Sequence, residues 1–180
     1  MRSGDVATDL QRPLDLQAYW LAQDLGRALY HGIFRGVPPF LVGALVFDVL
    51  APGGLGVWVA FLVSVTLAVV VSFGFRFLYN LAAFWVLDVR GVSVLASVAA
   101  AFFSGQYVAL AFYPEWLKVL AWSLPFAAMI QAPIEVFLGH VRGLELAGLL
   151  ALQAFWAAAL LLLGRALLGA ALRKLVVQGG

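Results

Sequence analysis

The sequence predicts an all-α fold, a polytopic helix bundle embedded in a membrane. Of the 180 residues, 64% are hydrophobic and 11% are charged, whereas soluble domains average about half apolar and about a quarter charged residues. The mean hydropathy is +1.02, and several apolar stretches approach or exceed the roughly 20 residues that a helix needs to cross a bilayer. A domain of this size still exposes about 30% of its unfolded-chain surface, so we expect lipid to cover the excess apolar surface.

Composition and motifs argue against chemistry carried out by the chain itself. The chain has no cysteine, which excludes disulfides, thiolate catalysis and cysteine metal sites. The formal charge is only +2 and the basic residues are scattered, so nucleic acid is not an expected partner. The sequence lacks the GxxxxGK[ST], HExxH and GxSxG motifs, and His31 and His140 stand singly. We therefore expect no catalytic residue, no metal site and no cofactor.

Residues 1–32 are predicted to form a cytosolic loop followed by an amphipathic helix at the membrane surface. The first 17 residues are polar and lack the apolar core of a signal peptide, so we expect them in the cytosol. Within residues 14–36 four polar side chains recur at four-residue spacing, Gln23, Arg27, His31 and Arg35. Such a stripe suits an interfacial helix, but it also suits the solvated start of a membrane helix, and the pattern alone does not decide.

Residues 33–180 are predicted to form the transmembrane domain with about four spans. Pro38 and Pro39 are expected to kink or restart the first helix, and the APGGLG turn ends it. The second apolar stretch has about thirty residues, more than a bilayer crossing needs, so this helix must tilt, bend or project. Small residues in the third allow close helix contact. The predicted spans are about 33–51, 57–87, 91–112 and 144–168.

The segment 113–143 is predicted to be a re-entrant pair of short helices on the extracytoplasmic side. It contains three prolines, which interrupt it too often for one straight span. Helices over 114–123 and about 126–137 would dip into the outer leaflet. Backbone that is not helical is tolerated at membrane depth only where protein or water covers it, so this segment should pack against the bundle or line a cavity.

The basic residues predict that both termini are cytosolic. With the N-terminus inside, eight basic residues face the cytosol: Arg2, Arg12, Arg27, Arg35, Arg90, Arg165, Arg173 and Lys174. Lys118 and Arg142 then lie outside, and Arg76 is undecided. This distribution obeys the positive-inside rule. An even number of spans agrees with it.

Three polar residues are candidates for a translocation path or for the bundle interior. Arg76 and Asn80 lie one turn apart in the second predicted span, where polar groups normally face the bundle interior. An interhelical contact, or Arg76 reaching back to the interface, is an alternative to a path. Glu135 lies in the re-entrant segment and must be paired or neutral in an apolar setting. A structural partner such as Arg142 is an alternative to a role toward substrate.

Several stretches, in order along nearly the whole chain, resemble one family. RSGDVATDLQRPL at 2–14 resembles the family's cytosolic loop, AFWVLDVRGV at 83–92 its inner turn, and AFYPEWL at 111–117 part of its extracellular re-entrant region. That region is further matched by SG at 104–105, LPF at 124–126, Pro133 and Gly139, and the last helix and tail by Gln153, Trp156 and the terminal VQGG. The family is that of the permease subunits of type-2 ATP-binding cassette (ABC) exporters, in its bacterial branch. Its members carry two further helices before the RSGD-like loop, so the chain resembles the last four of six spans.

The resemblance implies a permease without an ATP site of its own. A separate ABC ATPase dimer would drive it, two permease subunits, identical or different, would enclose the path, and the cargo would be amphipathic or lipid-like. The candidate ATPase contacts are Arg2, Gly4, Asp5, Asp9, Leu10, Arg12 and Pro13. A membrane scaffold or assembly factor without transport activity is the alternative function. A secondary transporter would usually show internal repeats and more ionisable residues at mid-membrane.

Overall fold

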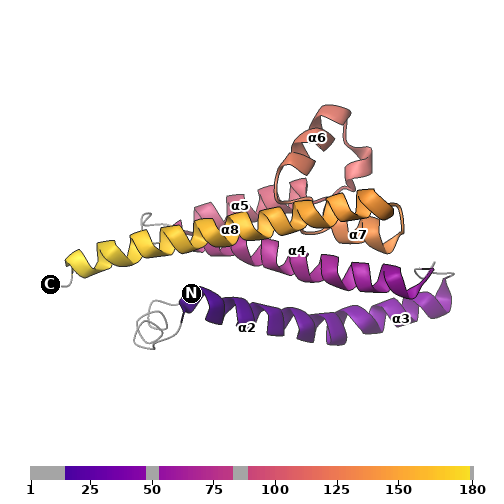
Figure 1. Cartoon of the computed structure of the whole chain (residues 1–180), viewed down its shortest axis with the longest axis horizontal. Helices are drawn as coiled ribbons and strands as arrows, with labels where there is room; N and C mark the ends of the chain where they lie inside the picture. Colours follow the sequence, from indigo (N-terminus) through magenta and orange to yellow (C-terminus); the bar gives the residue numbers. More distant parts are fainter. Residues whose placement is uncertain (1–14, 48–52, 83–88, 179–180) are drawn as a thin grey trace.

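The computed structural model describes residues 15–47, 53–82 and 89–178, and the side chains of its last helix as far as Ala171. Every regular element in these ranges is a helix (Figure 1). Three helices there are long and apolar enough to cross a membrane, over Leu16–Val46, Leu55–Leu81 and Gly143–Ala171. The predicted all-α membrane helix bundle is thereby confirmed.

The first long helix runs without a break from the predicted surface segment into the predicted first span. It consists of α2 (Leu16–His31), a π-helical turn η1 (Gly32–Gly36) and α3 (Val37–Val46). The N–H of Val37 bonds to the carbonyl of Gly32, five residues back. Prolines 38 and 39 lack N–H groups, so carbonyls one turn earlier lose their α-helical partners, and the wider turn directly precedes them. The expected restart is therefore a π-helical turn inside one continuous helix.

The centre of the bundle is the parallel pair α4 (Leu55–Leu81) and α8 (Gly143–Gln178), which lie side by side (Figure 1). Gly74 of α4 faces Leu160 of α8 so closely that a Cβ at Gly74 would lie 2.7 Å from the Leu160 Cβ. Val71 and Leu160 are buried in the same apolar cluster. Small residues allow such close helix contact where lipid offers no hydrophobic drive for association.

The shorter helices lie between α4 and α8 in the chain. They are α5 (Val89–Phe103), η3 (Leu110–Phe112), α6 (Glu115–Ser123) and α7 (Gln131–Phe137). The helix predicted over 91–112 ends early, at Phe103, because a turn follows in which Gly105 has φ +85°, a conformation that glycine adopts readily. With 15 residues, α5 is shorter than the roughly 20 that span a bilayer.

The two short helices predicted within 113–143 are present as α6 and α7, with α7 beginning later than expected. Residues 124–130 make turns between them. Phe137 of α7 packs edge-on against Phe40, Trp58 and Phe61, with ring centroids 5.1–6.1 Å apart. In contrast, α6 projects away from the long helices (Figure 1). The segment is therefore attached to the bundle mainly through α7 and the preceding turns.

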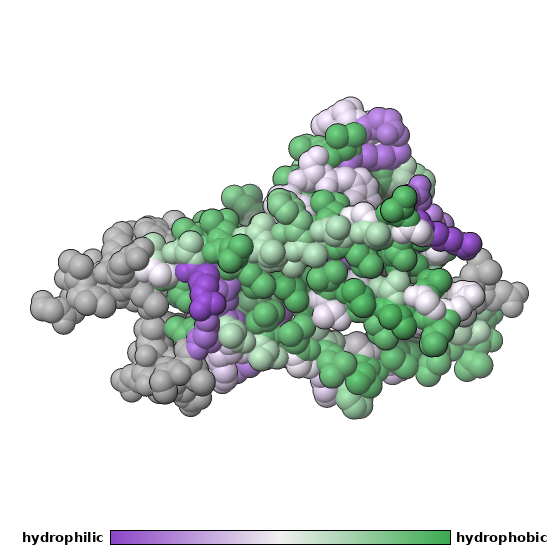
Figure 2. All heavy atoms as spheres, in the orientation of Figure 1, coloured by the Kyte–Doolittle hydropathy of each residue, from purple (hydrophilic) through white to green (hydrophobic). Residues whose placement is uncertain are grey.

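The surface of the bundle is mostly apolar. Figure 2 shows hydrophobic side chains along the long helices and hydrophilic ones gathered toward their ends and on α6. Large apolar side chains are exposed along α3, α4 and α8, among them Leu45 at 87%, Leu62 at 61% and Leu162 at 69%. A membrane protein exposes such side chains to lipid, as the composition predicts.

Candidate functional site

The helix α2 is joined to α4 and α8 by polar contacts at the end of the bundle where α2 begins and α8 ends (Figure 1). Arg76 Nη2 of α4 lies 2.5 Å from Asp24 Oδ2 of α2. Arg165 Nη2 of α8 lies 2.8 Å from Asp15 Oδ2, and Gln17 Nε2 donates to the Leu161 carbonyl at 2.8 Å. We call Asp15, Gln17, Asp24, Arg76 and Arg165 the terminal clasp.

Local structure explains how Asp15 comes to serve the clasp. Asp15 is the N-cap of α2, and its Oδ1 accepts from the backbone N–H groups of Gln17 and Ala18 at 3.1 and 3.2 Å. Such a cap satisfies amide groups that have no partner inside the helix. The other carboxylate oxygen remains for Arg165. One side chain therefore fixes both the start of α2 and its distance from α8.

Next to the clasp, apolar side chains of α2 pack against α4 and α8. The Trp20 ring of α2 lies edge-on to Phe77 of α4, with centroids 5.9 Å apart. Gly164 of α8 makes room for this contact, because a Cβ there would lie 2.8 Å from Phe77 Cδ1 and 3.2 Å from Gln17 Nε2. Gln17 is only 6% exposed. This arrangement holds α2 in one register against both long helices.

Two of the candidates for a translocation path or the bundle interior lie in or near the clasp. Arg76 makes an interhelical ion pair with Asp24, which was one of its two alternatives in the sequence. Asn80 lies one turn further along α4 and is half-buried. The predicted ATPase contacts, Arg2, Gly4, Asp5, Asp9, Leu10, Arg12 and Pro13, lie outside the described residues. They end two residues before Asp15 of the clasp.

Sequence reasoning did not identify the acidic partners in the clasp. Asp15 and Asp24 lie in the segment whose polar stripe was predicted to face the membrane surface. Each is far from its arginine partner in the sequence. The signal that could have found Asp24 is its place in α2. It stands seven residues before His31 and therefore lies within about 20° of it around the helix, on the polar side of α2.

A buried polar contact joins the middle of α4 and α8 to the turns before α7. Ser64 Oγ donates to Gln153 Oε1 at 2.9 Å, and Gln153 Nε2 donates to the carbonyls of Ser64 at 3.1 Å and Ala128 at 2.8 Å. Both side chains are 0% exposed. Because the amide of Gln153 bonds to Ser64 of α4 and to Ala128 of these turns, it fixes the position of the turns relative to the long helices.

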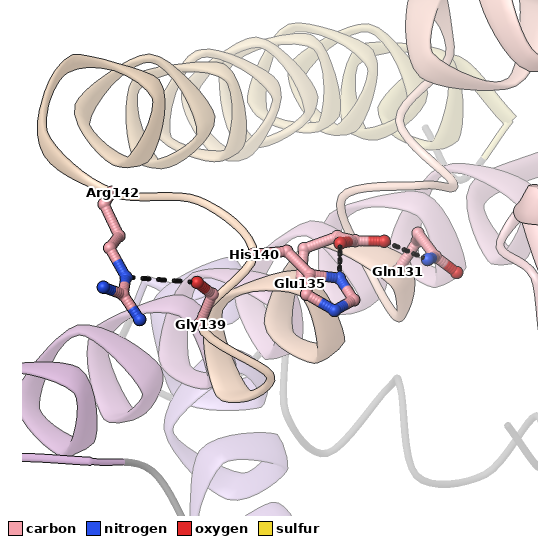
Figure 3. A network of polar contacts seen from close by, with 5 residues as sticks. All are labelled: Gln131, Glu135, Gly139, His140 and Arg142. Carbon is pink, nitrogen blue, oxygen red and sulfur yellow. Dashed lines mark hydrogen bonds and ion pairs between the residues drawn. The ribbon is translucent and has the colours of Figure 1, made fainter.

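Glu135 of α7 is paired, although Arg142 is not its partner (Figure 3). Its Oε2 lies 2.8 Å from His140 Nδ1, and its Oε1 accepts from Gln131 Nε2 at 2.6 Å. Arg142 instead donates from Nε to the carbonyl of Gly139 at 3.3 Å. Arg142 was the expected structural partner, but His140, three residues after the end of α7 and two before Arg142, pairs with Glu135 instead. The pairing with His140 and Gln131 therefore connects Glu135 to both ends of α7.

The candidate residues do not converge on one reaction centre. Arg76 lies in the terminal clasp, whereas Glu135 lies in α7, which packs beside the opposite, N-terminal part of α4 (Figure 1). Among the described residues, no three His, Asp or Glu side chains are grouped as metal ligands. The arrangement can transmit a force from the start of α2 to α4 and α8, and it can hold the re-entrant helices in place.

The sequence matches the family described as ABC-2 family transporter protein over residues 1–179. No curated protein and no solved structure matches the chain. The match covers the residues before α2, the long helices and the segment 113–143 together, which agrees with the resemblance seen in the separate stretches. This multi-pass membrane chain therefore belongs to the ABC-2 family of transporter permeases.

Proposed function

We propose that the chain is the membrane-spanning permease subunit of an ABC exporter, driven by a separate ATPase subunit that contacts residues 2–14. The observation that carries the proposal is the terminal clasp. It ties the first residues after this loop to both central helices through Asp15–Arg165 and Asp24–Arg76. A displacement of the loop by the ATPase would therefore move α2 together with the ends of α4 and α8.

The charges of the loop suit a docking surface. Arg2, Asp5, Asp9 and Arg12 place two basic and two acidic side chains within eleven residues. Complementary charges give a partner surface specificity and a fixed register. Pro13 restricts the backbone just before α2. The same charges could instead pair with one another or with lipid headgroups, which would make the loop structural.

The proposal also includes a second subunit, an outer cap and a class of cargo. A second permease subunit, identical or different, would complete the path, and the re-entrant segment with α6 and α7 would cap its outer end. The apolar surface of the long helices and the absence of a large charged cluster among the described residues suit an amphipathic or lipid-like cargo. Transport by this mechanism needs no catalytic residue or cofactor in the permease.

We place the protein in the cell membrane with both termini in the cytosol. The basic-residue bias supports this orientation, as does the fact that α2 begins and α8 ends at one end of the bundle (Figure 1). Single cysteines at Ser3, Glu115 and Gln178 can be tested with an impermeant thiol reagent in intact cells, since the chain has no cysteine of its own. We expect labelling at Glu115 alone. Labelling at Ser3 or Gln178 without Glu115 would reverse the orientation.

The deciding experiment is co-purification of the cognate ATPase with the parent and with the Arg12→Glu and Asp5→Arg variants. Neither residue lies in a predicted span, so membrane insertion should persist while ATPase recovery falls. Lys118→Glu is the matched control, since it reverses a charge in α6, outside the clasp. Equal recovery of the ATPase with all variants, and equal transport-coupled ATP hydrolysis, would show that residues 2–14 are not the coupling surface. Failure of the parent to recover any ATPase would favour the scaffold alternative.

A further inference from the structure

Two complementary polar groups adjoin the same apolar cluster without bonding to each other. The buried residues of this cluster are Val71, Ala128, Ala157 and Leu160. Trp156 of α8 and Met129 of the turns before α7 pack against it. The indole Nε1 of Trp156 is buried, and of the buried side-chain nitrogen and oxygen atoms in the described residues it alone has no hydrogen-bond partner. A buried indole N–H usually finds an acceptor, so this one marks an unused bond.

The complementary acceptor is the backbone carbonyl of Met129. In an α-helix a carbonyl accepts from the N–H four residues later. That residue is Pro133, which has no N–H to donate. Within the described residues no hydrogen bond reaches the Met129 carbonyl, whereas the preceding carbonyl, that of Ala128, accepts from Gln153 Nε2 at 2.8 Å. The turns therefore offer α8 one acceptor that is used and, one residue later, one that is not.

Helix α8 likewise presents two donors to the turns, one used and one unused. Gln153 donates to the Ala128 carbonyl, and its amide is held in place by Ser64, whose Oγ donates to Gln153 Oε1 at 2.9 Å. Trp156 stands three residues after Gln153, which is about 4.5 Å further along the helix at a rise of about 1.5 Å per residue. The two donors therefore define two neighbouring positions for the turns on α8.

The local structure permits the turns to shift between these positions. Residues 124–130 form no regular helix, and α6, which precedes them, projects away from the long helices and can follow a displacement (Figure 1). The residues that the turns and α8 contribute to the buried cluster include Ala128 and Ala157, so small side chains pass each other there. Small shifts of one packed element against another between discrete positions are a common form of conformational switch.

We infer that the turns 124–130 exchange between two positions on α8, one held by the bond from Gln153 to the Ala128 carbonyl and one held by a bond from Trp156 Nε1 to the Met129 carbonyl. The structure shows the first position. In the second, Gln153 keeps its bonds with Ser64, so one hydrogen bond replaces another and the two free energies differ little. Both positions are then populated, and a partner can shift the balance between them. We assign them to two states of the outer cap, an assignment that rests on the proposed function.

The test follows the indole N–H of Trp156 by nuclear magnetic resonance in the full chain, isotope-labelled at tryptophan, in nanodiscs without an ATPase. The chain has six tryptophans, and Trp156→Phe identifies the resonance by its loss. Gln153→Leu removes the bond that holds the first position. We expect the population with a hydrogen-bonded, downfield-shifted Trp156 N–H to rise about fivefold in this variant, which is about 1 kcal/mol. Trp116→Phe, which removes an exposed indole of α6, should leave the Trp156 resonance unchanged.

Two results would overturn the exchange of positions. One is a Trp156 resonance that is the same in the parent and in Gln153→Leu. The other is equally strong magnetisation transfer from water to the Trp156 N–H in both proteins, which would mean that a bound water and not Met129 is the acceptor. Ser64→Ala provides a milder variant if Gln153→Leu does not fold, since it loosens the Gln153 amide and should shift the populations less but in the same direction.

The role of the exchange in the outer cap is tested in the complex with the ATPase. Trp156→Phe removes the donor of the second position, so transport-coupled ATP hydrolysis should fall severalfold while ATPase co-purification stays unchanged. Hydrolysis equal to that of Trp116→Phe would contradict the assignment to the cap. The resonance measurement needs no ATPase, so a parent that recovers no ATPase would refute the proposed function and leave the exchange itself standing.

Discussion

The central pair α4–α8 and the first helix α2–α3 are both apolar and long, yet they are held in opposite ways. The central pair is joined along its length by close contacts such as Gly74 against Leu160 and by the buried Ser64–Gln153 bonds. The first helix is held at its start by the terminal clasp, while almost every residue of η1 and α3 is exposed. Beyond the clasp, Phe40 meets Phe137 with ring centroids 6.1 Å apart.

This difference agrees with the proposed function, in which one part of the permease keeps its shape and another moves. Parts of a protein with few buried contacts open at a lower free energy than the core does. A permease needs one part that keeps its shape and another that moves when an ATPase pulls on it. The first helix has the properties expected of the moving part. The terminal clasp at its start follows residues 2–14 in the sequence, and η1 and α3 at its other end are almost entirely exposed.

The largest expected effect comes from removing the same side chain from both regions. Leu160 in α8 is 6% exposed and Leu41 in α3 is 55% exposed. Leu160→Ala should lower the free energy of unfolding by about 2–4 kcal/mol because it leaves a cavity, whereas Leu41→Ala should change it by less than about 0.5 kcal/mol. Thermal unfolding of both variants in the same detergent measures this. Equal losses would mean that α3 is packed as tightly as the core.

A second comparison tests the close approach of α4 and α8. Gly74→Ala places a Cβ 2.7 Å from the Leu160 Cβ, so the two helices must separate, and overpacking of this kind typically costs about 1–3 kcal/mol. Gly148→Ala in α8 is the control, since nothing lies within 4 Å of its Cβ position. The control should keep or slightly raise the melting temperature, because alanine favours helix over glycine. A Gly74→Ala protein as stable as the control would show that the contact can relax.

The buried bonds of Gln153 should matter less than the packing. Gln153→Leu keeps the approximate size but leaves the Ser64 hydroxyl and the Ala128 carbonyl without this partner, which costs about 1–2 kcal/mol. Ser64→Ala combined with Gln153→Leu should recover part of the loss, because one unpaired group is removed with its partner. A double-mutant cycle on melting temperature measures the coupling. Additive losses would show that the two side chains stabilise the bundle separately.

Much of the fold could be predicted from the sequence, because apolar stretch length and proline positions determine where membrane helices lie. The second and last spans and the two short helices of 113–143 follow from these signals. The end of α5 at Phe103 could not be predicted in this way. Most residues from Tyr107 to Phe112 are again apolar. The break comes from the turn at Gly105, whose φ is +85° and which lies against Leu110 of η3 and Gln131 of α7.

The candidate site was harder to predict, since pairing between distant helices depends on their register. Arg76 was identified from its position in an apolar span, but its partner Asp24 is 52 residues away. Glu135 was expected to be paired, and it is, but the predicted partner Arg142 was wrong. Arg142 and His140 are both near Glu135 in sequence, and the turn at Gly139 brings His140 to Glu135 and Arg142 to the Gly139 carbonyl. Sequence patterns therefore identify which polar groups need partners better than they identify the partners.

The smallest expected effect on stability, and the most informative about the moving part, comes from the Asp24–Arg76 pair. Arg76 is 45% exposed at its side chain and Asp24 is 16% exposed, and partly exposed pairs of this kind contribute at most about 1 kcal/mol. Asp24→Asn should therefore leave the melting temperature nearly unchanged while it loosens α2 from α4. If the first helix transmits movement of the ATPase, transport-coupled ATP hydrolysis should fall severalfold in Asp24→Asn. The exchange Asp24→Arg with Arg76→Asp should restore it, because the two charges face each other again. Normal coupling in Asp24→Asn, with ATPase recovery equal to the parent, would show that this pair does not carry the movement and that Asp15–Arg165 or the apolar contacts of Trp20 hold α2 without it.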